Sequence, residues 1–154
     1  MHCNLQSAIC NNSGMTAEQQ AVAAANEAFY DALTNRDLPA MERLWFPADW
    51  VECLHPGAVA LRGWPTVRDS WALAFNAPSS VMVAATDIKV HLVGDIAWVS
   101  CTERLASTVD GHMTTAAAHA TNIFVRHDDD WRMVLHHSSP VPFVAPPETS
   151  GMVN

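Results

Sequence analysis

The chain has 154 residues, of which 49% are hydrophobic and 16% are charged, and its formal net charge at pH 7 is −8. This length and apolar content suit a single folded domain and exclude a disordered chain. One lysine and seven arginines stand against 16 acidic residues, which argues against binding to nucleic acid or to an anionic membrane surface. No apolar run approaches the ~20 residues that a membrane-spanning helix needs.

The two ends of the chain differ in composition from the middle. Residues 1–15 lack a basic stretch followed by an apolar core, so they are not expected to be a secretory signal. We expect a disordered leader over 1–15, one domain over 16–142 and an extended Pro-rich tail over 143–154. The four cysteines have no CxxC or zinc-like spacing and are expected to be reduced thiols. A cytoplasmic location follows as an expectation.

Three helices are predicted in the first half of the chain. Thr16 and Gln19 form a capping-box pattern, and the residues after them are apolar at helical spacing. Asp37 is a suitable cap for a second, short helix that contains Pro39 in its first turn. The predicted helices cover 17–35, 38–45 and 66–75.

The second half of the chain alternates apolar and polar residues, as strands do. Turn signals at Gly94-Asp95 and Asp110-Gly111 separate the long strands, which indicates an antiparallel meander. The predicted strands cover 50–55, 59–62, 81–93, 96–108, 113–127 and 131–139. Helices followed by a meander predict an α+β fold with the helices on one face of the sheet.

The hairpin loops determine which side chains share a face of this sheet. We take 110–112 as a three-residue loop, which pairs Arg104 with Ala118, and a loop centred on Asp129 brings Asn122 opposite His136. One face then carries Trp98, Ser100, Thr102, Arg104, Ala118, Asn122, Phe124, Val134, His136 and Ser138. The other carries Ile88, Val90, Val99, Cys101, Glu103, His119, Ile123, Leu135 and His137.

Both of these faces contain apolar residues, so both are expected to be covered. The chain's own helices cover only one face of the sheet. We therefore expect a homodimer that forms through the other, convex face.

Residues 16–142 contain five characteristic segments: NEAFYDALTNRDLPAMERLW, LHPG, LRGWPTVRDSW, HLVGDIAWVSCTE and WRMVLHHSSP. Their order and spacing resemble the SnoaL-like and ketosteroid-isomerase-like group of the nuclear transport factor 2-like superfamily. The second half is also similar to the association domain of calcium/calmodulin-dependent protein kinase II. The resemblance implies a cone-shaped roll, in which a long N-terminal helix and two short helices pack in a curved antiparallel sheet around a deep pocket.

The resemblance transfers function poorly, because this fold hosts isomerases, dehydratases and plain assembly modules. Phe29 stands where the steroid isomerases have an oxyanion-binding tyrosine, although Tyr30 follows it. His55 stands in place of their general-base aspartate before a proline, and their protonated aspartate falls near Ala118 or Ala120. Steroid isomerisation by that mechanism is therefore not expected.

The association domains of the kinase bind small carboxylates through arginines in their pocket. Arg104 matches one of these arginines, while Asn122 and Ser138 occupy the positions of two others. The resemblance implies that Arg104 anchors an anion. The alternative is a structural ion pair of Arg104 with Asp87 or Glu52.

Two histidines are candidates for proton transfer near neutral pH. We place His136 in the pocket beside Asn122, with a hydrogen-bonded core histidine as the alternative. His55 ends a strand at a turn and is a candidate general base, with a solvent-contacting turn residue as the alternative.

Three side chains on the other face, Glu103, His119 and His137, have the chemistry of zinc ligands. Their expected place at a subunit interface favours a network of hydrogen bonds there. No metal site is predicted.

Aromatic side chains are expected near the pocket, with Phe29, Tyr30 and Trp98 in contact with a ligand. The remaining tryptophans either line the pocket or form the core. The sequence lacks GxGxxG, GxxxxGK[ST], HExxH and GxSxG patterns, so no cofactor is expected.

Two hypotheses follow for the function. In the first, the protein binds a small organic acid or ketone and acts as a cofactor-free isomerase or dehydratase. In the second, it is a noncatalytic assembly module.

Overall fold

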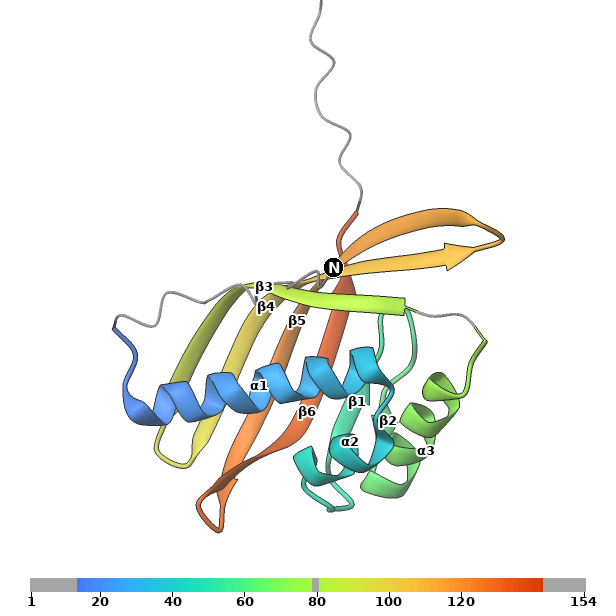
Figure 1. Ribbon diagram of the computed structural model, residues 1–154. Helices are drawn as coiled ribbons and strands as arrows, with labels where there is room; N and C mark the ends of the chain where they lie inside the picture. Colours follow the sequence, from blue (N-terminus) through green and yellow to red (C-terminus); the bar gives the residue numbers. More distant parts are fainter. Residues whose placement is uncertain (1–13, 79–80, 143–154) are drawn as a thin grey trace, which may run out of the picture.

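The computed structural model describes residues 14–78 and 81–142, and it contains three helices and six strands. Figure 1 shows their arrangement, with the long helix α1 lying across the sheet. The helices are α1 (Ala17–Asn35), α2 (Leu38–Leu44) and α3 (Trp64–Phe75), and the strands are β1 (Glu52–Leu54), β2 (Leu61–Arg62), β3 (Val81–Val93), β4 (Ile96–Val109), β5 (His112–His127) and β6 (Asp130–Pro140). The predicted tail and all but the last two residues of the predicted leader lie outside the described residues.

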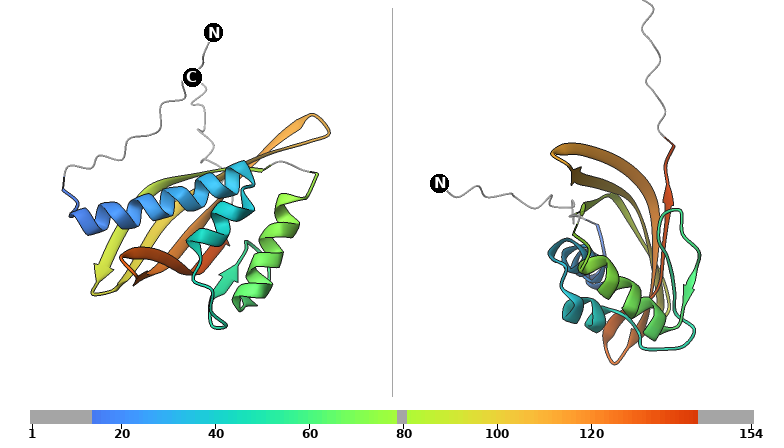
Figure 2. Two further views of the ribbon diagram at one scale, coloured as in Figure 1. Left: turned by 60° about the horizontal axis from the view of Figure 1, so that its bottom comes forward. Right: turned by 90° about the vertical axis from the view of Figure 1, so that its right-hand side faces the viewer.

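The six strands form one curved sheet in the order β2-β1-β6-β5-β4-β3. The meander β3 to β6 is antiparallel, as predicted, but β1 runs parallel to β6, so the sheet is mixed. The expected curved sheet is present, and its parallel pairing arises because the β1–β2 hairpin joins the outer edge of β6. All three helices lie on one side of the sheet, and no element of the described residues covers its other side (Figure 2). We call these the helix face and the open face.

Helix α1 begins where the sequence predicts it. Thr16 and Gln19 form the capping box in full, each side chain bonding the backbone N–H of the other residue. The helix buries a stripe that contains apolar side chains and also Asn26 and Tyr30, which are four residues apart on one side of the helix. These two polar residues therefore point into the core, which lies between α1 and the sheet.

The hairpin between β4 and β5 differs from the prediction by one residue. Asp110 and Gly111 have φ values of 50° and 78° and form a two-residue turn, because this turn type needs a positive φ at both central positions. Arg104 consequently pairs with Ala117 instead of Ala118, and Glu103 takes the place opposite Ala118.

The slip by one residue exchanges the two faces of β4, since side chains alternate along a strand. The buried side chains of β4 on the helix face belong to Ala97, Val99, Cys101 and Glu103. Trp98 and Arg104 are exposed and lie on the open face, where the sequence analysis did not place them.

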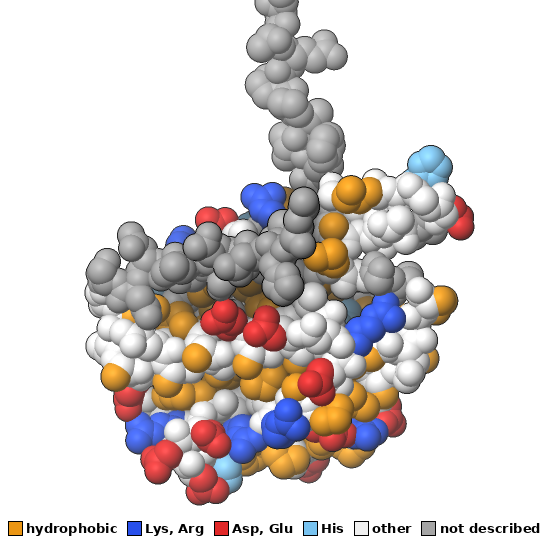
Figure 3. Space-filling model, viewed as in Figure 1, with side chains coloured by type: hydrophobic (Ala, Val, Ile, Leu, Met, Phe, Trp, Pro, Cys, Tyr) orange, Lys and Arg blue, Asp and Glu red, His pale blue; other side chains and the backbone are white. Residues whose placement is uncertain are grey.

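Charged side chains of both signs are mixed along the lower edge of the molecule in Figure 3, around the β5–β6 turn and α2. Arg126 contacts Glu18 at 2.5 Å, and Arg132 contacts Asp130 at 3.4 Å. Exposed pairs of this kind contribute little to stability. These ion pairs engage Arg126 and Arg132 at the surface, away from the core between the helices and the sheet.

We expect Thr16→Ala to lower the free energy of unfolding by about 1 kcal/mol, because the substitution leaves the Gln19 backbone N–H without its side-chain acceptor. Urea denaturation followed by circular dichroism measures this change. Thr16→Ser keeps the hydroxyl and is the matched control. An equal loss in both variants would contradict the capping role.

Candidate functional site

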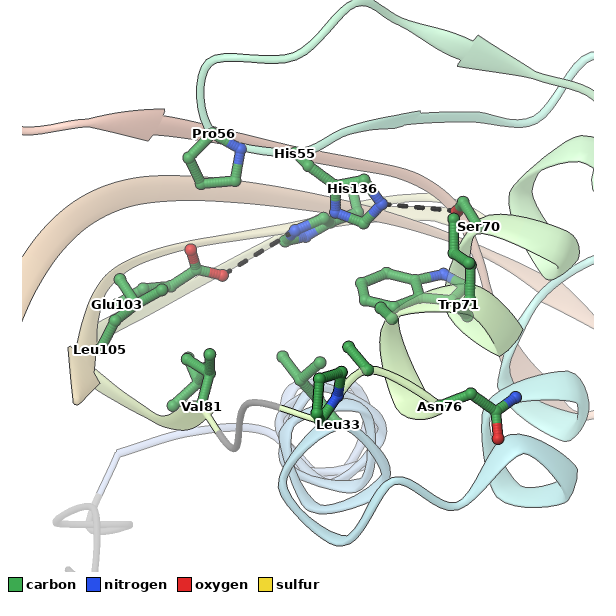
Figure 4. A pocket seen from close by; sticks show the side chains of 15 residues that line it. Leu33, His55, Pro56, Ser70, Trp71, Asn76, Val81, Glu103, Leu105 and His136 are labelled. Atoms are coloured by element: carbon green, nitrogen blue, oxygen red, sulfur yellow. Dashed lines mark hydrogen bonds and ion pairs between the residues drawn. The ribbon is translucent and has the colours of Figure 1, made fainter. Parts of the chain in front are cut away.

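A cavity of about 710 Å³ opens on the helix face, between the C-terminal end of α1, α3 and the sheet. Its walls are mainly apolar, and its size falls in the range typical of small-molecule sites. Figure 4 shows the side chains that converge on it. The residues that line it are Leu33, His55, Pro56, Ser70, Trp71, Leu73, Ala74, Asn76, Ala77, Pro78, Val81, Val83, Glu103, Leu105 and His136.

Two titratable side chains reach this cavity from the sheet. Glu103 comes from β4 and His136 from β6, and each is only 3% exposed. Their closest atoms, Glu103 Oε1 and His136 Nε2, are 3.9 Å apart (Figure 4). Strand β5 lies between β4 and β6 and contributes the small side chains of Ala118 and Ala120 there, which leaves room for the longer side chains to meet.

The Glu103 carboxyl group has a hydrogen-bond donor at each oxygen. The Tyr30 hydroxyl donates to Oε1 at 2.9 Å, and the Ser138 hydroxyl donates to Oε2. Burial raises the pKa of Glu103 above its ordinary value, although the two hydroxyl groups act in the opposite direction. Burial and the nearby Glu103 also raise the pKa of Tyr30, so its hydroxyl keeps its proton.

A chain of two amides fixes the tautomer of His136. The Asn122 Nδ2 group donates to Asn26 Oδ1 at 2.7 Å and to the Tyr30 hydroxyl at 3.3 Å, so its Oδ1 is the acceptor that faces His136. The His136 Nδ1–H group donates to this oxygen at 2.6 Å. The lone pair of the neutral ring is therefore on Nε2, the atom nearest Glu103.

His136 is neutral at pH 7. Burial, together with the neighbouring His55 and His137, lowers its pKa from an ordinary value of 6.5 to about 3. The Phe29 and Trp71 rings pack near the imidazole, with ring centroids at 4.9 Å and 6.1 Å. The floor of the cavity thus holds a neutral imidazole beside a carboxyl group that burial drives toward its protonated form.

His55 lies at the side of the cavity, with its ring 6.4 Å from that of His136. The Ser70 hydroxyl donates to the Val67 carbonyl at 2.7 Å, so its 3.4 Å contact with His55 Nε2 requires a hydrogen on that nitrogen. Burial lowers the pKa of His55. Burial also raises the pKa of the adjacent Cys53 thiol to about 12, which makes it a poor nucleophile.

The structure brings some of the predicted residues together and separates others. His55 and His136 line the cavity, while Phe29, Tyr30, Asn122 and Ser138 lie in the layer behind it. Arg104 and Trp98 lie on the open face, so neither contacts the cavity. Glu52, a predicted alternative partner of Arg104, contacts Arg62 at 3.0 Å instead.

Glu103 was not predicted as a cavity residue, because the assumed register put it on the opposite face. The signal that could have found it is the Asp110-Gly111 dipeptide, which favours a two-residue turn over the three-residue loop that we assumed. The same correction separates Glu103 from His119 and His137, which are exposed. Within residues 14–78 and 81–142, no three His, Cys, Asp or Glu side chains are grouped to hold a metal ion.

No helix in the described part of the chain is both long and apolar enough to cross a membrane.

We expect the free energy of unfolding to fall as the pH drops from 6.5 toward 3, because His136 stays neutral in the folded state while histidine in the unfolded chain becomes protonated. Glu103 contributes the opposite slope, since its raised pKa costs stability as the pH rises above 4.5. Urea denaturation at a series of pH values measures the sum of both.

His136→Gln is the matched variant for this prediction, because it removes the imidazole and keeps a hydrogen-bonding group. Its free energy of unfolding should no longer fall as the pH drops from 6.5 to 4, because only the opposite contribution of Glu103 remains. Parallel curves for the two proteins would show that His136 titrates normally in the folded state.

Comparison with known proteins identifies the family to which this chain belongs. Residues 22–144 match the family model described as SnoaL-like domain. The F-box protein SKIP8 of Arabidopsis thaliana is 33% identical over 123 residues, which are 80% of this chain and 51% of that protein. The chain therefore spans about half the length of this curated relative.

Two solved structures are similar in both sequence and fold. A “putative dehydratase from the NTF2-like family” of Streptomyces avermitilis is 34% identical with a TM-score of 0.73, over 79% of this chain and 95% of the other. A “putative calcium/calmodulin-dependent protein kinase type II association domain” from Thiobacillus denitrificans is 33% identical with a TM-score of 0.64, over 78% and 94%. With its family match over most of the described residues, the chain belongs to the SnoaL-like domain family.

Proposed function

We propose that the protein is a cofactor-free acid–base enzyme that isomerises or dehydrates a small carbonyl compound. The observation that carries this proposal is the buried pair of Glu103 and His136 at the floor of an apolar cavity. Perturbed titratable groups in a cavity are typical of catalytic sites. The dehydratase description of the relative from Streptomyces avermitilis supports the same class of reaction.

The two side chains suit complementary roles in the first step of either reaction. The Nε2 lone pair of His136 takes a proton from the carbon next to the carbonyl group, and the electron pair of that C–H bond forms the C=C bond of an enol. Protonated Glu103 gives its proton to the carbonyl oxygen in the same step. No net charge is gained or lost.

This step leaves an imidazolium and a carboxylate about as close as their neutral forms, 3.9 Å apart. The two opposite charges stabilise each other strongly in a buried site. The Tyr30 and Ser138 hydroxyl groups are already placed to donate to the new carboxylate. Return of the His136 proton to another carbon, while the enol O–H proton goes back to Glu103 and the C=O bond re-forms, completes an isomerisation. Delivery of the His136 proton to a departing hydroxyl group, again with return of the enol proton to Glu103, releases water and completes a dehydration.

The test is the exchange of the α-hydrogens of cyclohexanone in D₂O, followed by proton NMR, since both reactions begin with this proton transfer. We expect the protein to accelerate the exchange, and Glu103→Gln and His136→Gln to lose roughly 10²-fold or more of the acceleration. Arg104→Gln, on the open face, is the control and should exchange at the original rate. An exchange rate for Glu103→Gln equal to that of the unchanged protein would contradict the proposal.

A second candidate function is assembly through the open face. Trp98 pairs with Ile123 across the sheet, and Val93 pairs with Ile96 beside them, so apolar side chains share one region of that face. The exposed fractions are 66% for Val93, 52% for Ile96 and 36% for Trp98. Apolar clusters of this kind mark interaction sites, and the association-domain description of the Thiobacillus relative agrees with a homodimer here.

We expect Trp98→Glu to convert a dimer to a monomer, because it puts a charge at the centre of the apolar contact. Native mass spectrometry at micromolar concentration measures the change. Val59→Glu is the control, since Val59 is 80% exposed in the β1–β2 loop and outside this cluster. A dimer that survives Trp98→Glu would exclude this face as the interface.

A further inference from the structure

We infer that the ligand of the cavity is an uncharged molecule that donates a hydrogen bond, such as an alcohol or a hydroxy ketone, and that carboxylates are excluded. This inference rests on the proposed function and chooses between the two substrate classes, organic acids and ketones, that the sequence leaves open. It is argued from the charges and the hydrogen-bonding groups that the cavity presents.

The described walls of the cavity carry no cation. No lysine or arginine is among the described residues that line the cavity. Arg104 is exposed on the open face, and Arg68 forms an ion pair with Glu42 outside the cavity. Arg36, near the cavity mouth, donates to the backbone carbonyls of Phe75 and Ala77.

An anion beside Glu103 and His136 is costly. A carboxylate that enters the cavity leaves water, and this desolvation needs a buried partner of opposite charge. An ionised Glu103 repels the carboxylate of the ligand. His136 offers a positive charge only if it gains a proton, which its burial opposes.

The cavity also presents a hydrogen-bond acceptor that has no donor among the described residues. The lone pair of His136 Nε2 lies 3.9 Å from Glu103 Oε1, which is too far for a hydrogen bond. In the resting complex a buried acceptor of this kind binds a ligand that brings its own N–H or O–H group, and the same lone pair takes the carbon-bound proton in the proposed reaction only after that hydrogen bond is released. A carboxylate has no such group, whereas a hydroxyl group does.

The experiment compares three probes of nearly the same shape: cyclohexanecarboxamide, cyclohexyl methyl ketone and cyclohexanecarboxylate. The amide is neutral and donates, the ketone is neutral and does not donate, and the carboxylate is charged. Titration at pH 7, followed by the ¹⁵N–¹H spectrum of the protein, gives the dissociation constants. We expect the amide to bind most tightly, the ketone less tightly and the carboxylate at least tenfold more weakly than the amide.

Two lysine variants on β3 give matched controls. Val83 lines the cavity, and Ala84, the next residue, is exposed on the open face beside Arg104. Val83→Lys should reverse the preference and favour the carboxylate, because it supplies the missing cation. Ala84→Lys adds the same charge outside the cavity and should leave the preference unchanged.

Equal or tighter binding of the carboxylate to the unchanged protein would overturn the inference, and so would the absence of binding by all three probes. The exchange of cyclohexanone α-hydrogens distinguishes a failure of the inferred ligand class from a failure of the proposed enzyme activity. Exchange that depends on Glu103 together with carboxylate preference would refute the ligand class alone. Preference for the amide without any exchange would refute the enzyme and leave a binding site for neutral molecules.

Discussion

The cavity depends on the pairing of β4 with β5, because this pairing decides which side chains of β4 are buried. The two-residue turn at Asp110-Gly111 sets the register, and a shift by one residue would put Arg104 where Glu103 now lies. The same sheet would then bury a guanidinium among apolar walls. The acid–base character of the site thus follows from backbone conformation at a turn seven residues beyond Glu103.

Helix α1 completes the site from the other side. Asn26 and Tyr30 are buried one helical turn apart, and they hold Asn122 of β5 and Glu103 of β4 by hydrogen bonds. A polar network inside a core is costly unless its members are paired. Here the pairing has a consequence for chemistry, because the orientation of the Asn122 amide determines which nitrogen of His136 carries the hydrogen. The network therefore positions the reacting groups, while the Asn26 Nδ2 group has no hydrogen-bond partner among the described residues.

Much of the fold could be predicted from local patterns. The capping box marks the start of α1, and the period-two alternation marks the four long strands. The pairing of Asn122 with His136 was also predictable from the β5–β6 loop. The face of Glu103 was predictable only from the Asp110-Gly111 dipeptide, because it depends on the length of one loop. The parallel pairing of β1 has no local signal, since β1 has three residues and its partner is far along the chain.

The alternation of side chains along β4 also explains how one chain can serve both candidate functions. Glu103 and Arg104 are neighbours in sequence and belong to opposite faces, so chemistry and assembly impose separate constraints on adjacent positions. Among the described residues, the buried face carries no fixed positive charge that would hold an anion. Its reactivity would come from a proton that moves between two neutral groups, and this favours substrates whose own charge stays at zero.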